Sequence, residues 1–135
     1  MSERQKQLYH FWQHVADQDA AALADYFTSE AQIRWHNTNE LFTVPEFIRA
    51  NCEYPGHWAG EVEQMEEHPD GCRAMTITKV WSVDEGIVCR VVSFFAFVED
   101  KIACLDEFWG DVGPAPVWRQ EMHIGKPLQE KESKV

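Results

Sequence analysis

The stretch from Val91 to Val98 is the feature of this sequence that most constrains the fold. It reads Val-Val-Ser-Phe-Phe-Ala-Phe-Val, with apolar side chains at both even and odd positions. Successive side chains of a strand point to opposite faces of a sheet, so this strand needs cover on both faces. Helices elsewhere in the chain can cover one face. We expect a second copy to cover the other, sheet against sheet, unless the segment around Trp118 shields it.

The first half of the chain predicts three helices and a short strand. Apolar residues recur at i, i+3, i+4 and i+7 from Leu8 to Val15, the spacing of an amphipathic helix. Asp19 can cap a second helix, whose inward face would carry Leu23, Tyr26 and Phe27. After a strand around residues 32–37, the capping box from Thr43 to Glu46 begins a third helix. That helix must end before Pro55.

From Glu61 onward the pattern changes to strands separated by turn sequences. The expected strands cover residues 61–67, 72–83, 87–98 and 102–109. Helices followed by antiparallel hairpins define an α+β architecture. We expect a single domain over residues 1–128, with a loop at 110–116 and a frayed tail at 129–135.

The charge balance argues against several classes of partner. The chain has 12 basic and 23 acidic residues, a formal net charge of −11. Nucleic acids and anionic membranes attract basic proteins, so neither is expected as a partner. The N-terminus has no apolar core of a secretory signal, and no run reaches the roughly 18 apolar residues of a membrane helix. We therefore expect a cytoplasmic protein.

Neither a metal nor a cofactor is expected. The four cysteines form no C-x-x-C pair and are expected to be free thiols in a reducing compartment. His10 and His14 are spaced i, i+4, but no third ligand accompanies them. The sequence also has no glycine-rich phosphate loop and no G-x-S-x-G elbow.

Three stretches carry a resemblance to a known superfamily: Asp19 to Phe27 continued by residues 30–33, Arg34 to Glu40, and Lys101 to Trp109. They resemble the SnoaL-like, polyketide cyclase-like branch of the nuclear-transport-factor-2-like superfamily, and the element order agrees from about residue 5 to residue 110. The resemblance implies a cystatin-like cone, in which a curved antiparallel sheet wraps around three N-terminal helices and a central pocket. It also implies a homodimer paired through the convex sheet face. The superfamily holds isomerases, dehydratases, epoxide hydrolases, cyclases and members that only bind, so the fold does not choose a function.

The residues of the steroid-isomerase members are absent from the matching positions. Phe11 stands where those relatives have a tyrosine on the first helix, Trp35 replaces their base, and Ser93 replaces their second acid. The arginine-bridged aspartate pair of the epoxide hydrolases is not recognisable either. Neither of these known catalytic routes is therefore expected here.

Glu107 is the strongest candidate for acid–base chemistry. Alternation in the last strand places it on one face with Ala103, Leu105 and Trp109, opposite Ile102, Cys104, Asp106 and Phe108. The resemblance points the face of Leu105, Glu107 and Trp109 into the cone. A carboxyl buried between leucine and tryptophan has a raised pKa, which suits a general base or acid. Alternatively, Glu107 forms an ion pair with Arg90, Arg119 or a histidine.

The polar run from Trp35 to Glu40 supplies a second set of candidates. Trp35 and Asn37 share a face with Ile33, so an indole and an amide would reach the pocket. Asn37 or His36 could then donate a hydrogen bond to a substrate carbonyl or a developing oxyanion. His36 could equally be solvated in a turn, and Glu40 could be a second pocket acid or face solvent.

Further side chains are expected to bind the ligand. Tyr54 and Trp58 flank Pro55-Gly56-His57, which would form the rim of the cone, although both could simply pack in the core. The remaining wall residues that we expect are Phe47, Ser93, Phe95, Leu105 and Trp109.

Two functions of different classes are consistent with these patterns. The first is a cofactor-free acid–base enzyme of the isomerase, cyclase or dehydratase type, acting on a small apolar molecule that bears a carbonyl or hydroxyl group. Glu107 would move the proton and His36 or Asn37 would polarise the oxygen. The alternative is a non-catalytic, dimeric small-molecule-binding protein. A protein-association module is a third reading, which a large exposed apolar patch would favour.

Overall fold

A computed structural model describes residues 1–128 of the chain. The segment expected to be a frayed tail, 129–135, lies outside the described residues. The helices are α1 (Glu3–Ala16), α2 (Ala20–Ala24), α3 (Val44–Cys52) and α4 (Val117–Gln120). The strands are β1 (Phe27–Trp35), β2 (Glu40–Phe42), β3 (Trp58–Glu67), β4 (Arg73–Ser82), β5 (Val88–Val98) and β6 (Lys101–Asp111).

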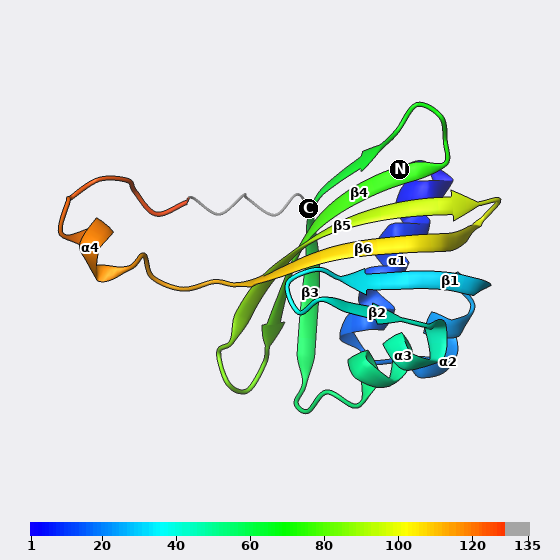
Figure 1. The fold of residues 1–135 in the computed structure, drawn as a ribbon, viewed down its shortest axis with the longest axis horizontal. Coiled ribbons are helices and arrows are strands. Elements are labelled where there is room, and N and C mark those ends of the chain that lie inside the picture. Colours follow the sequence, from blue (N-terminus) through cyan, green and yellow to red (C-terminus); the bar gives the residue numbers. More distant parts are fainter. Residues whose placement is uncertain (129–135) are drawn as a thin grey trace.

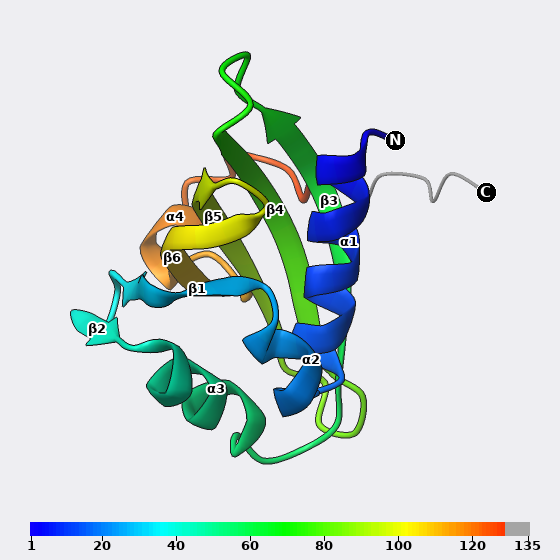
Figure 2. The ribbon, with the colours of Figure 1, turned by 90° about the vertical axis from the view of Figure 1, so that its right-hand side faces the viewer.

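The six strands form one curved sheet with the order β2-β1-β6-β5-β4-β3, and the N-terminal helices pack on one of its faces (Figures 1 and 2). We call the covered face the inner face and the other the outer face. α1 lies against β3, and α3 lies against β1 and β2. The expected α+β architecture is confirmed, with one difference: β1 and β6 are parallel, so the sheet is mixed rather than wholly antiparallel. Because β1 and β6 are far apart in the sequence, no hairpin fixes their relative direction.

The helix ends agree with the capping signals of the sequence. Ser2 caps α1 in a capping box with Gln5, and Thr43 caps α3 in a second box with Glu46. Asp19 caps α2 by accepting a hydrogen bond from the Ala22 backbone N–H. The apolar stripe of α1 is buried as expected, at Leu8, Phe11, Trp12 and Val15.

The second helix is shorter, and the first strand longer, than the sequence predicts. α2 ends at Ala24, and Phe27 lies in β1 instead of on a helix face. Phe27 pairs with Ile102 of β6 and is buried in the core, so sheet pairing overrides the helical spacing at this point. β2, a three-residue edge strand opposite the end of β1, was also not expected.

The strand β5 has one covered face. Val91, Ser93, Phe95 and Phe97 are buried against the helices. On the outer face, Phe94 is 48% exposed and Val98 is 59% exposed. The segment around Trp118 does not shield them, because the chain after β6 leaves the sheet and extends away from it (Figure 1). Among residues 1–128, therefore, no segment covers Phe94 and Val98 on the outer face.

Two further features bear on the sequence-based expectations. None of the helices among residues 1–128 is both long enough and apolar enough to cross a membrane. All four cysteines are free thiols.

Candidate functional site

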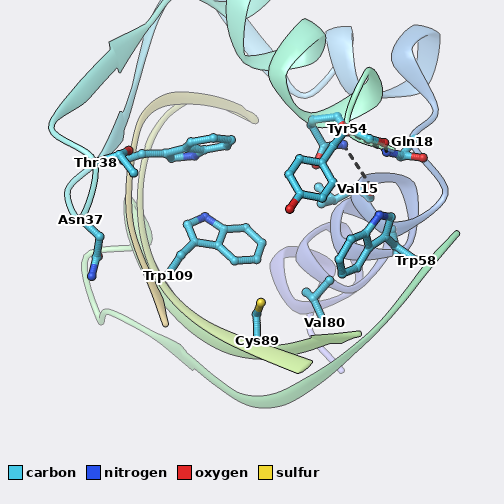
Figure 3. Close-up of a pocket in the computed structure, with 12 residues that line it drawn as sticks. Val15, Gln18, Asn37, Thr38, Tyr54, Trp58, Val80, Cys89 and Trp109 are labelled. Atoms are coloured by element: carbon cyan, nitrogen blue, oxygen red, sulfur yellow. Dashed lines mark hydrogen bonds between the residues drawn. The ribbon is translucent and has the colours of Figure 1, made fainter. Parts of the chain in front are cut away.

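A cavity of about 330 Å³ opens between the end of α1, the end of α3 and the inner face of the sheet (Figure 3). The helices contribute aliphatic side chains and amides, and the strand ends contribute aromatic rings. No charged side chain is among the described residues that line it. The lining residues are Val15, Ala16, Gln18, Trp35, Asn37, Thr38, Asn51, Tyr54, Trp58, Val80, Cys89 and Trp109.

Two pairs of aromatic rings face each other across this cavity. Trp35 and Trp109 meet edge to face, with ring centroids 6.3 Å apart, and Tyr54 and Trp58 do the same at 5.4 Å. Figure 3 shows Trp109 on one side and Tyr54 with Trp58 on the other. The indole N–H of Trp58 donates to the Pro55 carbonyl at 3.0 Å, which fixes its ring. Rigid aromatic walls of this kind suit an apolar, planar ligand.

Two amide side chains, Gln18 in the turn after α1 and Asn51 on α3, hold the mouth of the cavity in place. The Gln18 side-chain N–H₂ donates to the Asn51 carbonyl at 2.9 Å and to the Tyr54 carbonyl at 2.7 Å. The Asn51 side chain donates back to the Val15 carbonyl at 3.0 Å. Gln18 has a φ of +54°, a left-handed conformation that a side chain tolerates only when its surroundings impose it. These bonds tie the end of α3 to the end of α1.

Glu107 lies in the protein interior beneath the Trp35 and Trp109 rings, and it is not among the residues that line the cavity. Its side chain is fully buried, with 1% of the residue exposed. The Ser93 hydroxyl donates to one carboxyl oxygen at 2.7 Å, and the Trp35 indole N–H donates to the other at 3.1 Å. Both of these hydrogen-bond donors are neutral, in contrast to the ion-pair alternative. Arg90 instead pairs with Glu63.

Burial raises the pKa of Glu107 to about 7, against the lowering effect of its neutral donors Ser93, Trp35 and Trp109. The Trp109 indole N–H is buried without a partner at hydrogen-bond distance. We therefore attribute its effect on this pKa to its dipole and not to a formed hydrogen bond. A carboxyl with a pKa near 7 can exchange a proton at neutral pH.

Glu107 is one member of a polar row that crosses the inner face of the sheet. Thr76 pairs with Ser93, Ser93 with Glu107, and Glu107 with Trp35, on four adjacent strands. The Trp12 indole N–H donates to the Thr76 hydroxyl at 3.1 Å, from α1 into this row. The row therefore gives the buried carboxyl a hydrogen-bonded setting within an otherwise apolar core.

His36 lies away from the cavity, which corrects our expectation that it could polarise a ligand oxygen there. Its ring stacks on Phe108 at a centroid distance of 4.4 Å, and its Nε2 lies 2.8 Å from an Asp106 oxygen. Arg34 also binds Asp106, at 3.3 Å. Burial raises the pKa of Asp106, but hydrogen bonds from His36, Arg34 and Cys104 together bring it below the usual value. This cluster belongs to the outer face, as alternation from Trp35 requires.

The remaining candidates divide into cavity and core. Trp35, Asn37, Tyr54, Trp58 and Trp109 line the cavity. Phe47, Phe95 and Leu105 are buried in the hydrophobic core and do not reach it. Glu40 is exposed on β2, opposite Trp35, and is not a lining residue. Ser93 acts on Glu107 and not on the cavity.

Seven lining residues were not anticipated from the sequence. The sequence pattern could have indicated two of them as inward-facing, because Val15 belongs to the apolar stripe of α1 and Val80 alternates with the buried residues of β4. The Cys89 sulfur points into the cavity (Figure 3). Burial, and then Asp111, raise the pKa of that thiol. The seven residues are Val15, Ala16, Gln18, Thr38, Asn51, Val80 and Cys89.

Helices packed on a curved sheet around an apolar cavity are the architecture of the nuclear-transport-factor-2-like class. No protein-family model matches the sequence, and no curated protein matches it. Within the described residues, no group of three or more histidine, cysteine or acidic side chains is placed to hold a metal ion.

Solved structures of this class match from 81% to 96% of the chain. A candidate ketosteroid isomerase from Kribbella flavida has a TM-score of 0.75 and 19% identity, over 96% of this chain and 93% of its own. An NTF-2-like protein of unknown function from Burkholderia xenovorans has a TM-score of 0.72 and 20% identity, over 96% and 95%. A candidate SnoaL-like polyketide cyclase from Shewanella putrefaciens has a TM-score of 0.67 and 10% identity, over 81% and 80%.

This protein therefore has the nuclear-transport-factor-2-like fold, with SnoaL-like and ketosteroid isomerase-like structural neighbours. Epoxide hydrolases and cyclases are also among the neighbours. At these identities the likeness concerns the fold, and it assigns no activity to this chain.

Proposed function

We propose that this protein binds a small, neutral, largely apolar molecule in the cavity between α1, α3 and the sheet. The observation that carries the proposal is the lining itself, which combines four aromatic rings with no charged side chain among the described residues. At about 30 Å³ per water in the liquid, 330 Å³ corresponds to about eleven waters, which is room for a two-ring aromatic compound.

The charge of the protein supports a neutral ligand. An ionised carboxylate would lose its hydration in this cavity and find no cation there to pair with. The net charge of −11 would also repel an anion during its approach. Asn37 and Thr38 are among the polar residues of the lining, and an amide or hydroxyl group of this kind can bind one hydroxyl or carbonyl oxygen.

A titration with matched probes tests this proposal. We expect 2-naphthol to quench the intrinsic tryptophan fluorescence saturably, and 2-naphthoate to bind at least about tenfold more weakly. Ala16→Phe fills the cavity and should abolish 2-naphthol binding. Ala21→Phe, at an exposed position on α2, is the control and should leave it unchanged. Equal binding to the wild type and to Ala16→Phe would rule out this cavity as the site.

Acid–base turnover of the bound molecule is a second candidate function, favoured by the position of Glu107. Its pKa of about 7 suits proton transfer, and it lies beneath two of the rings that wall the cavity. It ranks second because Glu107 is only 1% exposed and is not a lining residue, so the structure must open before a ligand group can reach its carboxyl. No cofactor is needed for such a proton transfer.

The acid–base proposal is tested with a ketone of the same shape as the probe. We expect the wild type to catalyse exchange of the α-protons of 2-tetralone with deuterated water, followed by NMR. Glu107→Gln should lower the rate by about 100-fold or more while 2-tetralone still binds. Glu40→Gln, an exposed acid opposite Trp35, is the control. Unchanged exchange and unchanged affinity in Glu107→Gln would exclude this role.

A further inference from the structure

Most polar groups that line the cavity already have hydrogen-bond partners in the protein. The side-chain amides bind backbone carbonyls, two indole N–H groups bind a carbonyl and a buried carboxyl, and a thiol lies within hydrogen-bond distance of a carboxylate. A ligand could recruit these groups only by breaking contacts that shape the cavity. The lining side chains with such a partner are Gln18, Trp35, Asn51, Trp58 and Cys89.

The hydroxyl of Tyr54 has no hydrogen-bond partner among residues 1–128. Figure 3 shows the Tyr54 ring reaching from the end of α3 toward Trp109, with its hydroxyl pointing into the cavity. A tyrosine hydroxyl can both donate and accept a hydrogen bond. Tyr54 therefore presents an unused donor to whatever occupies the space between these two rings.

Other lining residues with unused polar groups are placed less favourably. The Trp109 indole N–H is buried, and it acts on the carboxyl of Glu107. Asn37 and Thr38 lie across the cavity from Tyr54, beside the turn between β1 and β2, and the Asn37 amide points away from Tyr54 (Figure 3). Tyr54 is therefore the strongest candidate for direct recognition of a ligand oxygen.

The chain holds Tyr54 in position through contacts that do not involve its hydroxyl. Its backbone carbonyl accepts a hydrogen bond from Gln18 at 2.7 Å, and the next carbonyl, that of Pro55, accepts one from the Trp58 indole at 3.0 Å. Gly56 follows with a φ of +102°, a conformation that other residues rarely adopt. The Tyr54 ring packs edge to face on Trp58. Removing the hydroxyl alone should therefore leave the ring in place.

A ligand that fills the cavity changes the surroundings of this hydroxyl. Without a ligand, water can solvate it, because Tyr54 is 57% exposed. A ring packed between Tyr54 and Trp109 displaces that water, and the hydroxyl then needs an acceptor from the ligand, since an unpaired buried polar group is costly. The apolar surroundings strengthen the bond once it has formed. The cavity therefore favours a ligand with an acceptor oxygen over a hydrocarbon of the same shape.

We propose that Tyr54 determines the specificity of this cavity by donating a hydrogen bond to a carbonyl oxygen, which makes neutral ring ketones the ligand class. The inference rests on the proposed binding function and names the group that recognises the ligand. A carbonyl suits a single donor, because it accepts a hydrogen bond without bringing a hydrogen that needs an acceptor of its own.

Calorimetric titrations of the full-length protein with 2-tetralone and tetralin test this role. The two probes share a two-ring frame, and only 2-tetralone has a carbonyl oxygen. We expect Tyr54→Phe to weaken 2-tetralone binding about fivefold or more and to leave tetralin binding unchanged. Tyr9→Phe, at an exposed position on α1 outside the lining, is the matched control and should change neither affinity. Circular dichroism checks that both variants fold.

The infrared carbonyl stretch of bound 2-tetralone is a readout that a residue acting only as a wall would not change. A hydrogen bond lowers this frequency, so we expect a lower value in the wild-type complex than in the Tyr54→Phe complex. Equal losses of affinity for both probes with an unchanged frequency would overturn the inference, as would wild-type affinities in Tyr54→Phe. The 2-naphthol titration decides the binding function separately in those cases. A wild type that binds neither probe nor 2-naphthol would overturn both proposals.

Discussion

Burial of the Glu107 carboxyl disfavours its ionised form and so makes the stability of the folded protein depend on pH. Its carboxyl has a pKa of about 7 in the folded chain, against an ordinary value of 4.5. Between these two pH values the folded state holds a proton that the unfolded state has released. The protonated form of Glu107 therefore favours the folded state. Its contribution to the free energy of unfolding is fully present below pH 4.5, and it decreases as the pH rises to about 7.

The prediction at this residue is a pH-dependent difference between the wild type and Glu107→Gln. Each pH unit over which the states differ in protonation is worth about 1.4 kcal/mol. From pH 4.5 to 8, the wild type should therefore lose about 3 kcal/mol of unfolding free energy relative to Glu107→Gln. Urea denaturation of both proteins at each pH measures it. A difference that stays constant with pH would show that Glu107 titrates normally.

For single residues, alternation along the strands predicted correctly which side chains of β6 share a face, with one exception. It grouped Leu105, Glu107 and Trp109 on one face, which the resemblance pointed into the cone, and the structure has all three on the inner face. It failed at Ile102, which is buried on the inner side although its parity places it opposite Leu105. The pairing of β5 with β6 shifts between Ala96 and Phe97, and a shift of one residue exchanges the faces. A local sequence pattern does not reveal such a bulge.

At the element scale, the turn between α1 and α2 positions the mouth of the cavity. Gln18 provides two hydrogen bonds from this turn to the end of α3. Gln18→Ala should lower the unfolding free energy by about 2 kcal/mol and weaken 2-naphthol binding, because both carbonyls lose their donor. Gln13→Ala, one turn earlier on α1, is the control. Wild-type stability and affinity in Gln18→Ala would mean that other contacts hold the mouth.

Helix starts were predictable from the sequence because they depend on local chemistry. The capping residues Asp19 and Thr43 both act as expected. Pairing between distant segments was not predictable in the same way. The parallel contact of β1 with β6 and the short edge strand β2 depend on where the chain returns to the sheet. The lining of the cavity was hard to predict for the same reason, because Gln18, Asn51 and Cys89 come from distant parts of the sequence and meet only in the folded protein.

At the scale of the whole molecule, the strand from Val91 to Val98 has one covered face and one open face among the described residues. Its inner face carries Ser93, which binds Glu107 beneath the cavity wall. Its outer face carries Phe94, which is 48% exposed. The two faces of this strand therefore differ in burial, and the proposed ligand cavity depends on the inner face alone.

The most direct test of a cavity for a neutral ligand is native mass spectrometry of the purified full-length protein, incubated with excess 2-naphthol. We expect one added probe, or one retained neutral molecule, per chain, and no added mass on Ala16→Phe. Denaturing extraction then identifies anything that was retained. A wild-type chain that carries no small molecule even in excess probe would contradict the claim.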